Sequence, residues 1–149
     1  FALRFCIALA PQHLGAAFKF YTDEFQANGE IPSPYKIACV NVIIGETNEE
    51  AKLHASTFYK MFLGLIRNQR SKMKQPNMDF YDDWTMVEEA QLSQMTAGSF
   101  IGDEETVARN LKQFIDRYKI NEIMMSCPIY SLEKRLYSME KFAAIISKI

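Results

Sequence analysis

The stretch Lys36–Ile44, with the sequence KIACVNVII, determines how the rest of the chain is interpreted. Apart from Lys36 and Asn41 it is apolar throughout, and it is rich in the β-branched residues Val and Ile. An apolar run without alternation is typical of a parallel strand that helices cover. The sequence therefore predicts a buried parallel strand here, and Gly45 marks its end.

A helix is predicted directly after this strand. Thr47 is followed three residues later by Glu50, which is the pattern of a capping box at a helix N-terminus. Apolar residues then recur at helical spacing, and we expect them to form the buried stripe of the helix: Ala51, Ala55, Phe58, Phe62, Leu65 and Ile66. Strand and helix together make one βα unit.

Three further βα units are predicted along the chain. Their strands are expected at 3–10, 99–102 and 120–129, and a helical pattern follows each. Asp103 and Ser131 are suitable N-caps for the last two helices. The final helix is expected to bury five residues at helical spacing: Leu132, Leu136, Met139, Ala143 and Ile146. The resulting order, β-α-β-α-β-α-β-α, predicts an α/β fold with parallel strands and right-handed crossovers.

Two architectures fit this order. One is an open, flavodoxin-like sheet with helices on both faces, and the other is half of an eight-stranded (β/α)8 TIM barrel with its helices outside. Periodicity does not separate them. A sequential strand order would be that of a barrel, whereas an order with a switch point would be that of an open sheet.

Length and charge limit the class of protein. The 149 residues are one domain's length, and 17 Lys+Arg against 18 Asp+Glu give a net charge of -1. This balance argues against nucleic-acid binding, and no apolar stretch approaches the roughly 20 residues of a membrane helix. The three cysteines lie in apolar runs, which is typical of reduced thiols and of a cytoplasmic protein. Because the chain enters an apolar run at Phe1, we expect residues 1–149 to be a single segment of a longer protein.

The segment 67–98 is predicted to be an irregular insertion or a lid-like segment. Its first part, Arg67–Pro76, is basic and polar, and we interpret it as a solvated connection, with attraction of a phosphate as the alternative. Its second part, Met78–Met95, carries Trp84 among acidic residues, and its end could form a short helix. Long excursions within compact domains are often lids or binding loops.

The sequence contains no glycine-rich phosphate motif, no Cys-x-x-Cys pair and no histidine at metal-ligand spacing. Candidate site residues are therefore chosen by their position relative to the predicted strands. In parallel α/β folds function collects where strands end. There His13 could act as a base or hydrogen-bond donor, whereas His54 is expected on a helix surface. Asn41, polar within an apolar strand, needs partners or a ligand if it is buried. Cys127 is expected to be a small core residue rather than a reactive thiol, and Tyr130 follows it.

Three stretches resemble the bacterial luciferase-like, flavin-dependent monooxygenases. Pro34–Ala51 resembles their sixth strand and the acidic start of the next helix. Ser99–Val107, with Gly102-Asp103 before two glutamates, resembles the entry to their seventh helix. Ile120–Tyr130, followed by Arg135–Glu140, resembles their eighth strand and last helix. Phe1–Pro11 matches their fifth strand more loosely. The resemblance covers nearly the whole chain.

This resemblance implies the C-terminal half of a barrel, with strands and helices five to eight. It implies a monooxygenase that uses reduced FMN and dioxygen on an aldehyde or another small organic substrate, although some branches of the family use a deazaflavin. Asn41, Cys127 and Tyr130 are then candidates for lining the flavin or substrate pocket, and His13 and Trp84 for contacting substrate or forming a lid. No catalytic residue and no metal ligand is assigned, because the family's catalytic groups lie mostly in the first half.

The same resemblance leaves an alternative open. The family's histidine near the end of the fifth strand is absent at Ile7 and Ala8, so the chain could be a degenerate half-barrel that acts as a structural or subunit-interaction module. On either interpretation, the unpaired edges of a half-barrel predict a homo-oligomer or pairing with the missing half. The fragment alone is expected to be inactive and to bind flavin poorly.

Overall fold

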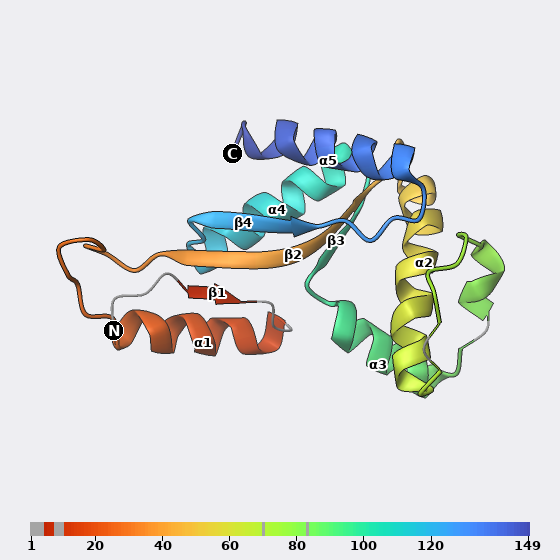
Figure 1. Cartoon of the computed structure of the whole chain (residues 1–149), viewed down its shortest axis with the longest axis horizontal. Helices are drawn as coiled ribbons and strands as arrows, with labels where there is room; N and C mark the ends of the chain where they lie inside the picture. The colour runs from red at the N-terminus through yellow and green to blue at the C-terminus, as the bar shows by residue number, and fades with distance from the viewer. Residues whose placement is uncertain (1–4, 8–10, 70, 83) are drawn as a thin grey trace.

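The structure, a computed structural model, describes residues 5–7, 11–69, 71–82 and 84–149. The predicted strand 3–10 is therefore described only over Phe5–Ile7, and its other residues lie outside the described part. Four βα units follow one another, with a 3-10 helix and an extra helix inserted after α2 (Figure 1). The elements are β1 (Phe5–Ile7), α1 (Pro11–Asp23), β2 (Lys36–Ile44), α2 (Asn48–Ile66), η1 (Met78–Asp82), α3 (Met86–Thr96), β3 (Ser99–Gly102), α4 (Glu104–Tyr118), β4 (Glu122–Ser126) and α5 (Leu132–Ile146). The predicted alternation is confirmed.

The four strands form one parallel sheet built around β2. Asn41 pairs with Ser99 of β3 on one edge of β2 and with Ser126 of β4 on the other. Because β4 also occupies residues 37–38, β1 must pair with them from the edge that β3 uses. The strand order is thus not the sequential one of a barrel, since β4 lies beside β2. The nine residues of β2 are long enough for the short β1 and β3 to share one edge.

Three of the four helices that follow strands, α1, α4 and α5, pack on one face of the sheet. Alternate residues of β2, from Ala38 to Ile44, pack in one apolar cluster with residues from three helices: Leu14 and Phe18 of α1, Val107 and Leu111 of α4, and Ile145 of α5. These three helices therefore contact the same face of the sheet, as helices on the outside of a barrel do, whereas α2 packs on the opposite face. We call the opposite face, which bears Ile37, Cys39 and Asn41 of β2, the open face.

Helix α2 covers only the carboxyl end of the open face. Ala55 and Phe58 pack there against Ile43 and Ile129. In Figure 1, α2 stands across the end of β2, with η1 and α3 beside it. The predicted stripe of α2 is correct at Ala55 and Phe58 but wrong at Leu65, whose side chain is exposed. His54, expected on the surface, is buried, because this side of α2 faces inward through several polar residues that an apolar pattern does not include.

The predicted buried face of α5 is wrong. Its five residues are all exposed: Leu132, Leu136, Met139, Ala143 and Ile146. We call this set the α5 stripe. The helix instead turns Ser138 and Ile145 toward the sheet, and both are buried. The Ser138 hydroxyl accepts a hydrogen bond from the Ile44 N–H at 3.0 Å, so a small polar residue, outside the apolar pattern, faces the sheet.

The segment 67–98 has a small core of its own, packed on α2. Phe80 of η1 and Leu92 of α3 are buried against Leu63 of α2. The helix anticipated at the end of the segment is confirmed as α3, which Thr85 and Glu88 open with a complete capping box. These contacts attach the insertion to the outer half of α2.

Candidate functional site

Three polar residues form a row across the open face. Ser99, Asn41 and Ser126 are register partners on β3, β2 and β4, so their side chains project from the same face of the sheet. We call them the polar row. It lies between the Ile43–Ile101 pair, which α2 covers, and the Cys39–Met124 pair, where Met124 is 50% exposed. The row therefore marks the boundary between the covered and the uncovered parts of the open face.

Within the polar row, the Ser99 hydroxyl is the most clearly unpaired hydrogen-bonding group. Its Oγ is buried and has no hydrogen-bond partner in the structure. Asn41, half-buried beside it, makes no side-chain hydrogen bond to the residues that the structure describes. Buried polar groups in proteins are almost always paired, and leaving one unpaired costs about 1–3 kcal/mol. An orphaned hydroxyl next to an unpaired amide is therefore an arrangement that a polar ligand would complete.

Cys127 lies directly after Ser126, at the carboxyl end of β4. Its side chain is half-buried against the cluster of Ile43 and Ile129. Burial raises the pKa of the Cys127 thiol above its ordinary value, so the thiolate is disfavoured at neutral pH. Its Sγ lies 3.9 Å from the Arg135 carbonyl oxygen, to which it donates. This environment suits a neutral packing residue rather than a nucleophile.

The other candidates lie in different places. Tyr130 follows Cys127 in a turn and is exposed. His13 is exposed in the first turn of α1, so it belongs to the helix rather than to a loop before it. Trp84 packs edge-on against Phe80 and Tyr81, with ring centroids 5.2 and 5.3 Å away. Asn41 and Cys127 thus lie near each other, because Asn41 pairs with Ser126 and Cys127 follows it. Tyr130 is exposed beyond the end of β4, and His13 and Trp84 belong to other parts of the fold.

An ion-pair cluster lies where α2 and α5 begin. Lys134 Nζ is 2.7 Å from Glu50 Oε1 and 3.0 Å from Glu46 Oε1. The hydrogen bond from Lys134 holds the pKa of Glu50 below its usual value, and the two carboxylates raise the pKa of Lys134. The buried His54 ring places Nε2 3.5 Å from Glu50 Oε1. The cluster fixes α5 against the first turn of α2.

The caps of these helices follow the sequence with one difference. The Thr47 hydroxyl accepts from the Glu50 N–H at 3.1 Å, as predicted. Glu50 does not return the bond to Thr47, as a capping box requires, but accepts from the Glu46 N–H at 2.7 Å. Asp103 and Ser131 cap α4 and α5 as predicted.

The turn at Gly102 joins two of the loops that follow the strands. Gly102 has φ 158°, at the edge of the region that favours glycine, and a Cβ there would lie 2.8 Å from Asn48 Oδ1. This close approach lets Asn48 accept from the Asp103 N–H and donate to the Asp103 carboxylate, both at 3.0 Å. The starts of α2 and α4 are thereby held side by side at the carboxyl end of the sheet.

Sequence reasoning missed Ser99, Ser126 and Ser138. Ser99 and Ser126 each sit at an end of a short strand, where register alone places them beside Asn41.

Across the part of the chain that is described, no group of three or more His, Cys, Asp or Glu side chains could hold a metal ion. In that same part, none of the helices is long and apolar enough to cross a membrane.

Known proteins with similar sequences are longer than this chain. No family model matches the sequence. The chain is 27% identical over 140 residues to the uncharacterised protein YddN of Bacillus subtilis (strain 168), covering 94% of this chain and 41% of that protein. It is 25% identical over 136 residues to a luciferase-like monooxygenase of Escherichia coli (strain K12), covering 91% and 41%. The chain thus spans about two fifths of the length of the curated relatives it matches.

The matching solved structures are also longer than this chain. The chain resembles apo-MsnO8 with a TM-score of 0.71 and 20% identity, over 92% of this chain and 42% of that one. It resembles the riboflavin lyase RcaE, solved with modified FMN and its substrate riboflavin, with a TM-score of 0.53 and 16% identity, over 96% and 38%. These findings confirm the resemblance to luciferase-like proteins. They also confirm the fold class as part of a larger α/β barrel, despite the strand order noted above.

Proposed function

We propose that this chain is the C-terminal part of a luciferase-like, flavin-dependent monooxygenase that uses reduced FMN and dioxygen on a small organic or aldehyde substrate in the cytoplasm. The observation that carries the proposal is the polar row, with the orphaned Ser99 hydroxyl. It lies on a sheet face that none of the described helices covers beyond its carboxyl end. The likeness to a luciferase-like monooxygenase over 91% of the chain supports it.

The residues of the row fit such a cofactor. The edge of the flavin ring carries both N–H and C=O groups, and the amide of Asn41 and the hydroxyls of Ser99 and Ser126 can each donate and accept. When bound, reduced FMN would supply the electrons with which dioxygen is activated. The part of this chain is to hold the polar edge of the ring through the row and to exclude water with the neighbouring apolar pairs.

Cys127 is a neutral neighbour of the polar row. Because burial raises the pKa of its thiol, Cys127 stays neutral and packs beside the row without adding charge. The basic or acidic groups of the reaction are proposed to come from the remainder of the protein. This agrees with the chain spanning only about two fifths of its relatives, and the fragment alone is proposed to be inactive.

Two surfaces of the chain suit contact with that remainder. One is the open face, where Met124 is half exposed, and the other is the α5 stripe. Its residues 132, 136, 139, 143 and 146 alternate in steps of four and three, the spacing of a helix seam that packs against another element. We propose that the rest of the barrel covers both surfaces.

The test is binding of FMN to the full-length protein and to variants of the row. Asn41→Ala and Ser99→Ala should each weaken binding about three- to tenfold, the value of one hydrogen bond. The measurement is quenching of flavin fluorescence, with reduced FMN followed by calorimetry under argon. Ser93→Ala, an exposed serine on α3, is the matched control and should leave the affinity unchanged. Wild-type affinity in both row variants would remove the row from the flavin site.

A second function, that of a non-catalytic module for subunit interaction, is favoured by the α5 stripe alone. The two functions differ in one result. A module would still associate through the stripe while the full-length protein bound neither oxidised nor reduced FMN.

A further inference from the structure

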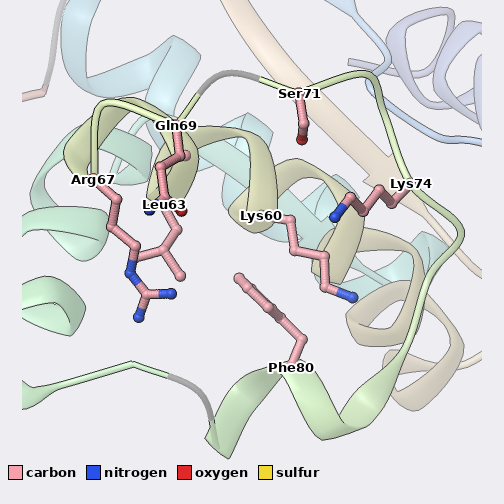
Figure 2. A pocket seen from close by; sticks show the side chains of 8 residues that line it. Lys60, Leu63, Arg67, Gln69, Ser71, Lys74 and Phe80 are labelled. Atoms are coloured by element: carbon pink, nitrogen blue, oxygen red, sulfur yellow. The ribbon is translucent and has the colours of Figure 1, made fainter.

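A cavity of about 370 Å³ lies between the outer half of α2 and residues 69 and 71–80. Among the described residues, eight line it, and none of these eight is acidic: Lys60, Leu63, Gly64, Arg67, Gln69, Ser71, Lys74 and Phe80. Figure 2 shows the side chains of Lys60 and Lys74 reaching into the same space, with the Ser71 hydroxyl above it and the Phe80 ring below. We call it the cationic cavity. Its volume is in the range of small-molecule sites.

The wall of the cavity is fixed in place by buried polar side chains of α2. The Thr57 hydroxyl donates to the Lys74 carbonyl at 3.0 Å, and the Ser56 hydroxyl accepts from the Asn77 N–H at 3.0 Å. Both side chains are fully buried, which explains two polar residues on an inward side of α2. At the other end, the Gln69 N–H donates to the Gly64 carbonyl, and a Cβ on Gly64 would lie 2.7 Å from the Gln69 oxygen. The loop therefore follows α2 closely at both ends of the cavity.

The three cations of the cavity are not equivalent. Arg67 makes two hydrogen bonds to Glu88 of α3, at 2.7 and 3.1 Å, and this guanidinium lowers the pKa of Glu88 to about 2. Arg67 is therefore neutralised by a carboxylate outside the cavity. Lys60 and Lys74 have no carboxylate within ion-pair distance among the described residues, and Lys60 Nζ lies 5.0 Å from the centre of the Phe80 ring.

We propose that the cationic cavity binds the phosphate group of a small phosphomonoester, with Lys60 and Lys74 as the charged ligands and Ser71 as a hydrogen-bond donor. Two like charges directed into one space repel each other unless an anion lies between them. A dianionic phosphate offers several acceptor oxygens, which matches two ammonium groups and a hydroxyl. The cavity is larger than a phosphate group alone needs, and the apolar side chains of Leu63 and Phe80 are available to the organic part.

The test is a titration of the full-length protein with ribose 5-phosphate and, separately, with inorganic phosphate, followed by calorimetry and ³¹P NMR. We expect saturable binding of one molecule per chain, tighter for the ester, and weaker as NaCl is raised. The double variant Lys60→Gln/Lys74→Gln should lose at least tenfold in affinity. The control is Lys112→Gln, an exposed lysine of α4 that lies 3.6 Å from Asp116, and it should bind like the wild type.

A structural role for the two lysines is separated by stability measured without ligand. If they form an empty phosphate site, the double variant keeps or raises the urea midpoint, because it removes a repulsion. In addition, ribose 5-phosphate should raise the melting temperature of the wild type but not of the double variant. Equal affinity of wild type and double variant would overturn the proposal, and so would a lowered urea midpoint accompanying the loss of binding.

Discussion

Helices α4 and α5 begin alike and pack differently. Each follows a parallel strand, each is capped by the side chain before it, and each crosses the same face of the sheet. The apolar side chains of α4 pack in the main cluster, with Val107 and Leu111 fully buried and others, such as Phe114, partly buried, whereas every residue of the α5 stripe is exposed. The apolar pattern of α4 is thus accounted for within the 149 residues, and that of α5 is not. We propose that the remainder of the protein covers the α5 stripe.

The largest expected effect is a difference between α4 and α5 in how much a truncated side chain lowers the free energy of unfolding. Leu111→Ala should lower the free energy of unfolding by about 2–5 kcal/mol, because it opens a cavity in the main cluster. Leu136→Ala in the same 149-residue chain should change it by less than about 0.5 kcal/mol, because the side chain is 51% exposed. Urea unfolding followed by circular dichroism measures both. Similar losses in the two variants would mean that α5 buries its stripe after all.

Leu136→Ala in the full-length protein tests whether the rest of the barrel covers the α5 stripe. If the rest of the barrel covers the α5 stripe, the same substitution should now cost about 2 kcal/mol or more. Ala144→Gly, on the neighbouring side of α5, is a control for helix propensity and should cost about 1 kcal/mol in both contexts. An unchanged, small effect of Leu136→Ala in the full-length protein would leave the stripe without a partner there.

Ser138 tests why α5 turns as it does. Ser138→Ala removes the acceptor of the Ile44 N–H in a fully buried position, and should cost about 1–3 kcal/mol. Ser147→Ala, at the exposed end of α5, is the matched control and should be near neutral. The measurement is again the urea midpoint. A neutral Ser138→Ala would show that the hydroxyl does not set the orientation of the helix.

Charging the stripe tests its role in assembly rather than stability. The double variant Leu136→Lys/Met139→Lys should leave the unfolding free energy of the 149-residue chain almost unchanged, because both side chains are exposed. It should abolish self-association of that chain, as measured by sedimentation velocity, since a charged seam cannot be buried against another apolar surface. Association at wild-type strength would assign it to the open face or the strand edges instead.

The smallest effect distinguishes the two caps by pH. The hydrogen bond from the Thr106 N–H lowers the pKa of Asp103, so this cap stabilises α4 above the ordinary aspartate pKa of about 3.9. That stabilisation is lost as the pH falls through the lower, folded-state pKa. The difference in urea midpoint between wild type and Asp103→Asn should therefore shrink between pH 5 and pH 2.5. For Ser131→Ala, which alters an uncharged cap, the difference should stay constant.

The sequence predicted the elements and the fold class because the signals involved are local. The unbroken run of β2, the caps at Thr47 and Asp103, and the periodicity of α4 each depend on neighbouring residues only. The buried hydrogen bond between the Ser138 hydroxyl and the Ile44 N–H joins residues 94 positions apart, which no apolar pattern encodes. The apolar pattern also does not encode the burial of His54, which lies on an inward side of α2 that carries several polar residues.

The candidate site was predicted in part. Asn41 was identifiable as a polar residue in an apolar strand, but its partners Ser99 and Ser126 depend on register between strands far apart in sequence. The order of the strands was also beyond reach, because it follows from β1 and β3 sharing one edge of β2. The cationic cavity combines both kinds of information. Its basic residues are visible in the sequence, whereas the pairing of Arg67 with Glu88 is visible only in the structure.

The most direct test of the account is one titration, carried out with FMN on the full-length protein and on the 149-residue chain side by side. The account predicts that the full-length protein binds reduced FMN at one site, and that the 149-residue chain binds it poorly or not at all. Absence of measurable binding of both oxidised and reduced FMN to the full-length protein would contradict it.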